Sequence, residues 1–246
     1  IIKYEDMSPN LINAFVAVED KTFFEHGGFN YVRLVGSVVN SVTKGVRIQG
    51  TSTITQQLAR NLYLVESKSK RTMDRKIKEA YYTLELEKLR KKEQIIEAYL
   101  NTIWLGAGAN GVQAAAQSYF SKDASQLDLV ESAILAGIPS SPANYTPMLR
   151  LEKADIGEGS RIIDDSDSQY TLVYNDTAQK RYNVVLKLML ENGFITQEEY
   201  DRSKDIDLYD RIVPSKLSND DITSYFADMV RDEVLEALMA QYSYTK

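Results

Sequence analysis

Residues 49–61 read QGTSTITQQLARN, and this stretch predicts a loop that runs directly into a helix. Its glycine and short hydroxyl-bearing residues suit a backbone that passes close to another group. The helix is expected over Thr53–Leu64, with Gln56 and Gln57 near its start and Arg60 one turn later. Amides, hydroxyls and a guanidinium are groups that hydrogen-bond sugars and phosphates. The alternative is a Ser/Thr-rich N-cap that starts an ordinary helix.

Apolar residues at helical spacing recur on both sides of this stretch and predict a mainly α fold. Leu11, Phe15 and Glu19 share one such stripe, for which Ser8-Pro9 supplies a cap and a first turn. The other helices are predicted over Val32–Val42, Arg71–Arg90, Glu93–Leu105, Val112–Phe120, Leu127–Ala136, Gln179–Asn192, from Thr196 onward, and over Ile222–Tyr242.

Two segments lack this spacing. Pro139, Pro142 and Pro147 predict an irregular connection after the helix that ends near Ala136. The acidic segment 156–176 predicts a loop with a short hairpin around Tyr170–Tyr174.

The composition of the 246-residue chain is that of a globular protein with room for one large domain, or one domain and an appendage. A formal net charge of -6 argues against a general nucleic-acid binder. The absence of cysteine excludes disulfides and thiolate metal sites, and the single histidine, His26, cannot by itself form a histidine metal site. No apolar stretch of the sequence is long enough to span a membrane. Because the chain begins Ile1-Ile2-Lys3 without a methionine, we expect a processed or excised piece whose parent's membrane anchor, if there is one, has been removed.

Glu19 and Asp20, followed by His26, form the first candidate for chemistry. A carboxylate on the apolar stripe of a helix is partly desolvated, and the neighbouring Phe23 and Phe24 would add an apolar wall. Desolvation raises the pKa of a carboxyl group and makes it a better base near neutrality. The alternatives are a solvated acid pair at a helix end and a local hydrogen-bonding role for His26.

A basic run in an otherwise acidic chain is the second candidate. Arg71, Arg75 and Glu79 fall on one helical face, and Lys76 and Lys78 lie beside them. Arginines one turn apart can hold two phosphoryl groups, and a carboxylate beside them can tune the site. The alternative is a solvated helix face with internal acid–base pairing.

These segments resemble, in this order, the motifs of the peptidoglycan glycosyltransferase domain of class A penicillin-binding proteins and monofunctional transglycosylases. The motifs are AVEDKTFFEHGG at 17–28, GTSTITQQLARN at 50–61, RKIKEAYYTLELE at 75–87, NTIWLGAGANGVQAAAQSYF at 101–120 and ESAILAGIPSSPANYTP at 131–147. Without this context the fourth motif indicates only close helix packing. The chain departs from the family at Thr51, where a smaller residue is usual, and at Arg60, where lysine is usual. Trp104 and Asn110 stand where tyrosine or phenylalanine is more frequent.

The resemblance implies a lysozyme-like helical domain over residues 1–212, with a smaller membrane-facing subdomain after Gly28. Residues 213–246 then resemble the start of a linker toward a transpeptidase domain that lies outside this chain. The implied reaction is polymerisation of lipid II, with the lipid-pyrophosphate-linked growing glycan as donor and the lipid II 4-hydroxyl as acceptor. Inversion at the anomeric carbon would give β-1,4 links. The implied location is the extracytoplasmic face of the bacterial cytoplasmic membrane.

In the family pattern, Glu19 is the base that deprotonates the acceptor, and Glu79 assists at the donor pyrophosphate. The substrate contacts implied by the resemblance are Asp20, Phe23, His26, Ser52, Thr53, Gln56, Gln57, Arg60, Asn61, Arg71, Arg75 and Lys76. No cofactor is required and no metal ligands are assigned, although a divalent cation near the pyrophosphate is compatible with this chemistry. The expected partners are lipid II, the growing glycan, the membrane surface and the parent's transpeptidase domain, without nucleic acid.

Two alternatives stay open at this point. One is a lysozyme-like hydrolase, which would need a carboxylic acid that protonates the leaving oxygen; the basic run argues against it, because cations lower the pKa of a neighbouring acid. The other is a catalytically silent scaffold that binds cell-wall polymer, against which the presence of both Glu19 and Glu79 argues. The apolar residues between Gly28 and Gly50 are expected either to enter lipid or, as Val35, Val38 and Val39, to lie in the core.

Overall fold

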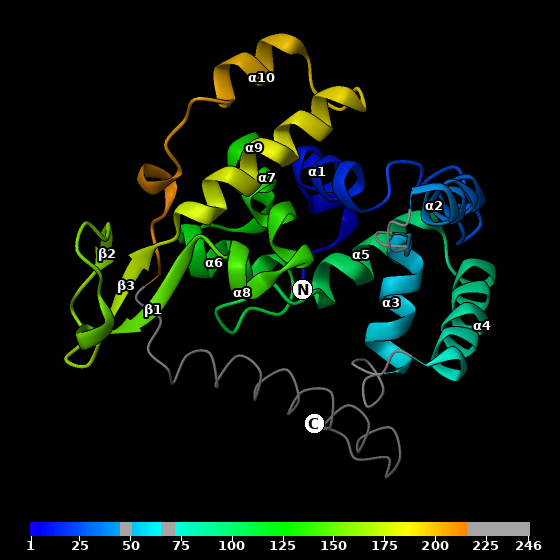
Figure 1. Ribbon diagram of the computed structural model, residues 1–246, viewed down its shortest axis with the longest axis horizontal. Coiled ribbons are helices and arrows are strands. Elements are labelled where there is room, and N and C mark those ends of the chain that lie inside the picture. The colour runs from blue at the N-terminus through cyan, green and yellow to red at the C-terminus, as the bar shows by residue number, and fades with distance from the viewer. Residues whose placement is uncertain (45–50, 65–71, 216–246) are drawn as a thin grey trace, which may run out of the picture.

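The computed structural model describes residues 1–44, 51–64 and 72–215 of the chain, and helices dominate these ranges (Figure 1). The helices are α1 (Pro9–Glu19), α2 (Tyr31–Lys44), α3 (Ile54–Tyr63), α4 (Met73–Leu89), α5 (Lys92–Thr102), α6 (Val112–Phe120), α7 (Leu129–Gly137), α8 (Pro142–Tyr145), α9 (Asp176–Glu191) and α10 (Gln197–Ser203). The strands are β1 (Met148–Glu152), β2 (Ile162–Asp164) and β3 (Tyr170–Tyr174). The mainly α fold expected from the sequence is therefore confirmed.

The core forms where α1, α7 and α9 pack against one another. Helix α7 is buried from Val130 to Gly137, so it runs through the interior. Large side chains fill the space around it, including the fully buried Phe15, Tyr99 and Tyr182. Complete burial of a side chain of this size contributes about 1.5–3 kcal/mol. This rigid centre fixes the C-terminal end of α1, where Glu19 lies.

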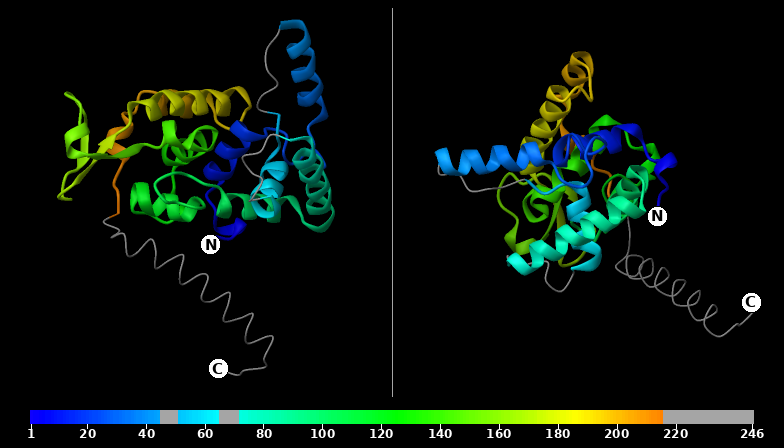
Figure 2. Two further views of the ribbon diagram at one scale, coloured as in Figure 1. Left: turned by 60° about the horizontal axis from the view of Figure 1, so that its bottom comes forward. Right: turned by 90° about the vertical axis from the view of Figure 1, so that its right-hand side faces the viewer.

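Helix α3 lies beside this core and packs against α4 and α5. Helix α2 projects from the body next to them, as the left view of Figure 2 shows. The antiparallel sheet, in the order β1-β3-β2, lies at the opposite end of the long axis of the molecule (Figure 1). Its register pairs Met148 with Tyr174 and Glu152 with Tyr170.

The start of α3 is fixed by Thr53, whose hydroxyl serves two purposes. It accepts a hydrogen bond from the backbone N–H of Gln56 at 3.2 Å, and the Gln56 side-chain oxygen accepts one from the Thr53 N–H at 2.9 Å. This reciprocal capping box satisfies two of the N–H groups that a helix start leaves without partners. The same hydroxyl donates to the carbonyl of Gly28 at 2.7 Å and so attaches α3 to the chain that follows α1.

Most predicted helices occur within a few residues of the expected bounds, and Val112–Phe120 is found as predicted. Helix α5 ends at Thr102 rather than Leu105, because the Leu105 N–H instead bonds the carbonyl of Ala109 across a tight turn. The irregular connection expected from Pro139 to Pro147 is wrong in part, since it contains α8, and strand β1 begins directly after it. The helix predicted over Ile222–Tyr242 lies outside the described residues.

Replacement of Gly28 with alanine tests how closely the chain after α1 packs on α4. Gly28 has a φ of +93°, and a Cβ there would lie 2.7 Å from the Thr83 Cγ2. Gly159 is the matched control, because it has a φ of +84° and a Cβ there meets no atom within 4 Å. We expect Gly28→Ala to lower the free energy of unfolding by about 1–3 kcal/mol more than Gly159→Ala, because only the first adds overpacking to backbone strain. Urea unfolding measures both, and equal losses would contradict the packing.

Candidate active site

Glu19 is the last residue of α1, and its half-buried carboxylate faces α3. The Gln57 side-chain N–H donates to its Oε2 at 2.7 Å. A second hydrogen bond fixes the orientation of that amide, because the buried Tyr99 hydroxyl donates to the Gln57 Oε1 at 3.3 Å. Burial raises the pKa of Tyr99 well above its ordinary value, so the phenol stays protonated and keeps this donor role. A chain of two hydrogen bonds therefore holds the Glu19 carboxylate in place.

The pKa of Glu19 is raised, chiefly because burial penalises its charged form. The hydrogen bond from Gln57 and the positive charges of Arg181, Arg33 and Arg60 oppose this shift and limit it. A carboxyl group with a raised pKa is a stronger base once it is ionised. The expectation that desolvation activates Glu19 thus agrees with its surroundings.

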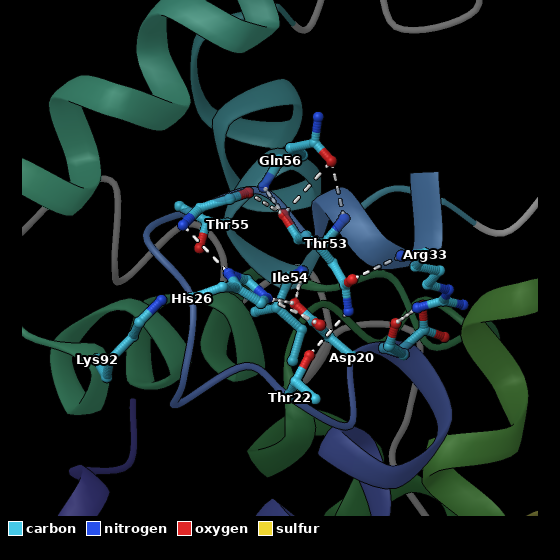
Figure 3. Close-up of polar contacts among 12 residues, drawn as sticks. Asp20, Thr22, His26, Arg33, Thr53, Ile54, Thr55, Gln56 and Lys92 are labelled. Carbon is cyan, nitrogen blue, oxygen red and sulfur yellow. Dashed lines mark hydrogen bonds and ion pairs between the residues drawn. The ribbon is translucent and has the colours of Figure 1, made fainter. Parts of the chain in front are cut away.

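Asp20 and His26 tie the end of α1 to the start of α3 (Figure 3). The Asp20 carboxylate is fully buried and accepts from the His26 Nε2 at 2.9 and 3.0 Å, and from the backbone N–H of Ile54 at 3.2 Å. The His26 Nδ1 accepts from the Gly28 N–H at 3.2 Å, so the ring proton lies on Nε2. This geometry gives Asp20 and His26 positioning roles within the protein.

Phe23 is also fully buried, with its ring against Phe24 and with the Lys92 ammonium 4.5 Å from the ring centre. A substrate contact was expected for Phe23 and Asp20. The structure instead places both side chains beneath the site, where they support the residues that face it.

Glu79 occupies a fully buried position on α4 among three cations. The Arg75 Nη1 lies 2.7 Å from its Oε2, and the Arg60 Nη1 lies 3.5 Å from the same oxygen. The Lys76 ammonium is hydrogen-bonded to the other oxygen, Oε1. The Lys76 Nζ also donates to the Ser52 hydroxyl at 3.4 Å. Three positive charges around one carboxylate leave a local excess of positive charge, which is the electrostatic setting that phosphates require.

Helix α3 brings the two carboxylates into one site. Gln57, which contacts Glu19, and Arg60, which contacts Glu79, are three residues apart and therefore share one face of the helix. With a rise of about 1.5 Å per residue, their backbone positions are separated by about 4.5 Å along the axis. Arg60, which is paired with Glu79, also attracts the Glu19 carboxylate, so one cation acts on both acids.

The remaining predicted site residues make no direct contact with Glu19 or Glu79 among the interactions of the described residues. Thr53 and Gln56 engage each other in the cap of α3, and Asn61 is half-buried on the same helix. Arg71 lies outside the described residues.

Two cations near Glu19 were not predicted from the sequence. Arg33, on α2, donates from Nη1 to the Glu19 carbonyl at 2.7 Å. Arg181, on α9, donates from Nε to the carbonyl of Gly137 at 3.1 Å and attracts the Glu19 carboxylate. Arg33 follows Glu19 by 14 residues and Arg181 lies on α9, which packs on α1, so no local spacing in the sequence points to either cation.

Within residues 1–44, 51–64 and 72–215, no group of three or more His, Asp or Glu side chains could hold a metal ion. The divalent cation considered at the pyrophosphate stays a prediction.

Comparison with known proteins places this chain in a family. The sequence profile described as Transglycosylase matches residues 1–190. Penicillin-binding protein 1A of Aquifex aeolicus is 39% identical over 233 residues, which are 95% of this chain and 28% of that protein. Penicillin-binding protein 2D of Bacillus subtilis is 46% identical over 153 residues, or 62% of this chain and 22% of that protein. Penicillin-binding protein 1A of Escherichia coli is 38% identical over 203 residues, or 82% of this chain and 21% of that protein. The chain thus spans less than a third of the length of these relatives.

Replacement of Gln57 tests the hydrogen bond that restrains Glu19. Because this bond lowers the pKa of Glu19 against the larger effect of burial, Gln57→Ala should raise that pKa further. Gln56→Ala is the matched control, since the Gln56 amide is engaged with Thr53. Titration of the Glu19 carboxyl carbon by ¹³C NMR measures the shift. A pKa that stays the same or falls in Gln57→Ala would contradict the arrangement.

Proposed function

The chain belongs to the transglycosylase family, whose activity is glycosyl transfer in peptidoglycan synthesis, and we propose that it polymerises lipid II into β-1,4-linked glycan strands. The donor is the growing glycan attached to its lipid through pyrophosphate, and the acceptor is the 4-hydroxyl of lipid II. The observation that supports this proposal most strongly is the pairing, across one face of α3, of a desolvated carboxylate with a cluster of cations.

Glu19 acts as the general base in this reaction. A sugar hydroxyl is a weak nucleophile and needs to lose its proton as it attacks. The acceptor oxygen forms a bond to the anomeric carbon of the donor, its proton passes to Glu19, and the bond from that carbon to the pyrophosphate oxygen breaks. Attack on the face opposite the leaving group inverts the anomeric centre, which converts an α-linked diphosphate into a β link.

The cations around Glu79 receive the leaving group. The electron pair of the broken bond stays on the diphosphate, whose negative charge grows in the transition state. Arg60, Arg75 and Lys76 supply fixed positive charge there, and such preorganised stabilisation is commonly the largest single contribution to catalysis. Glu79 holds these side chains together while leaving the cluster with excess positive charge.

The same cluster disfavours the hydrolase alternative. A hydrolase of this type needs a neutral carboxylic acid that donates a proton to the leaving oxygen. Glu79 instead lies in ion pairs with Arg60, Arg75 and Lys76, which suits an anionic leaving group. The scaffold alternative is disfavoured by the raised pKa of Glu19, because a group that only binds polymer gains nothing from a tuned base.

Helix α2 supplies a surface for peripheral contact with the membrane. Val32 is 85% exposed and Val35 61% exposed, and Leu34 and Val39 are exposed as well. Of the two expectations for this segment, exposure of Val35 and Val39 favours contact with lipid over burial in the core; the Val38 side chain lies outside the described set. Among the described helices, none is long and apolar enough to cross a membrane. From the exposed apolar side chains of α2 we propose a membrane-facing subdomain at this helix, on the outer face of the cytoplasmic membrane.

The length of the relatives supports a further partner. Because this chain spans less than a third of them, we propose that a transpeptidase domain follows it in the parent protein.

Glu19→Gln tests the base directly. It preserves size but removes the proton acceptor, and we expect polymerisation of labelled lipid II to fall by about 10²–10⁴-fold, the usual contribution of a general base. Separation of glycan polymer from cleaved muropeptides distinguishes transfer from hydrolysis in the same experiment. Gln197→Glu on the distant α10 is a charge-altering control and should leave the rate unchanged. Full turnover by Glu19→Gln, with its thermal midpoint intact, would reject Glu19 as the base.

Val32→Asp tests the membrane surface. A charge on the exposed face of α2 should weaken sedimentation of the protein with anionic phospholipid vesicles at least severalfold, because burial of a charge in the lipid interface is costly. Val184→Asp, at an exposed valine of α9, is the matched control and should bind as the unmodified protein does. Equal vesicle binding by both variants would show that α2 does not enter the interface.

A further inference from the structure

A cavity of about 1120 Å³ lies at the end of the molecule that carries the sheet, and none of its lining residues belongs to the groups around Glu19 and Glu79. Its walls come from the loop 104–108, from α8, and from strands β1 and β3 with the segment before β3. Small-molecule sites commonly measure about 300–1,000 Å³, so this cavity has room for a ligand of several sugar units.

The loop wall presents Trp104, the one tryptophan of the chain, with 41% of its surface exposed. A β-bridge to Asn110 holds its backbone, and the turn between them places Ala107 at a φ of +47°. A left-handed residue other than glycine costs about 1–2 kcal/mol. A Cβ on Gly106 would lie 2.1 Å from the Thr146 Cγ2, so the turn is fitted closely against its neighbour. The fold thus holds the backbone of an exposed aromatic residue in place at a cost in stability.

The sheet wall contributes polar groups beside a second aromatic ring. The Arg150 guanidinium lies 4.1 Å from the centre of the Tyr170 ring and 3.7 Å from the Asp167 carboxylate. Asp164 and Ser166 line the same wall. Aromatic faces stack on the C–H faces of sugar rings, while carboxylates, hydroxyls and guanidinium groups hydrogen-bond their hydroxyl and amide substituents.

The charge of the lining selects against anions. Among the described lining residues, Asp164 and Asp167 outnumber Arg150, the single cation, so this part of the lining carries a net negative charge. A diphosphate, which suits the cations around Glu79, would be repelled here. The lining therefore favours a neutral carbohydrate.

A short series of contacts connects the cavity with Glu19. Arg181 attracts the Glu19 carboxylate and also lies 5.4 Å from the centre of the Tyr145 ring. Tyr145 ends α8, and Pro142 and Ala143 of the same helix line the cavity. Helix α8 thus lines the cavity and also contacts, through Tyr145, the cation that attracts Glu19.

We propose that this cavity is a second carbohydrate site, which holds the neutral sugar backbone of a β-1,4-linked N-acetylhexosamine strand. The assignment of polymerised strand as the ligand rests on the proposed function. The assignment of a carbohydrate site rests on the lining of the cavity alone. Trp104 forms the stacking surface, and Arg150 and Asp167 hydrogen-bond the ring substituents.

The fluorescence of Trp104 tests the proposal, because the chain has no other tryptophan. Titration with N-acetylchitohexaose should give a saturable blue shift, both in the unmodified protein and in Glu19→Gln. Arg150→Ala and Asp167→Asn should each weaken binding at least tenfold. Arg202→Ala, at an exposed arginine of α10, is the matched control and should leave binding unchanged. Inorganic pyrophosphate should produce no saturable shift.

Absence of a saturable response to the hexasaccharide would overturn the proposal, as would unchanged affinity in both cavity variants with intact thermal midpoints. A saturable response to pyrophosphate would show an anion site instead. If lipid II is not polymerised but the hexasaccharide binds, the proposed function fails and the carbohydrate site stands. If lipid II is polymerised and Trp104 does not respond, only the second site fails.

Discussion

The site depends on a single buried carboxylate that joins two helices. Asp20 is the C-cap of α1 and accepts hydrogen bonds from the first backbone N–H of α3 and from His26. A negative charge at a helix N-terminus is favourable, and removal of one partner from such a buried group leaves the other unsatisfied at considerable cost. Because Asp20 directly follows Glu19, this bond fixes the position of Glu19 relative to α3. Helix α3 in turn carries Gln57 to Glu19 and Arg60 to Glu79.

The carboxylates of Glu19 and Glu79 differ because their surroundings differ. Glu19 is desolvated and restrained by one amide, with cations at a distance, and its pKa is raised. Glu79 lies in direct ion pairs with Arg75 and Lys76. Two acids in opposite environments can take opposite tasks, and the tasks that we propose are proton removal from one substrate and organisation of positive charge for the other. The surroundings differ because Gln57 of α3 contacts Glu19, whereas Arg75 and Lys76 of the same helix α4 pair with Glu79.

Much of this arrangement could be predicted from the sequence, and the exceptions share a cause. Helix α3, its Thr53 cap and the proximity of Arg75 to Glu79 are local in sequence, so periodicity and spacing reveal them. Strand β1 escaped prediction because its five residues gain order only from pairing with β3, about twenty residues later. Arg33 and Arg181 escaped for the same reason, since tertiary packing alone brings them to Glu19. The motif correctly predicted that Asp20 and Phe23 lie near the site. A motif does not report burial, and their full burial indicates a supporting role.

The most direct test of the central claim is an experimental structure of the protein with a non-cleavable lipid-diphosphate donor analogue and an acceptor sugar. The account predicts that the diphosphate contacts Arg60 and Lys76 while the acceptor 4-hydroxyl lies about 2.6–3.2 Å from the Glu19 carboxylate. A diphosphate bound away from these cations, or an acceptor hydroxyl beyond reach of Glu19 in the presence of both ligands, would contradict it.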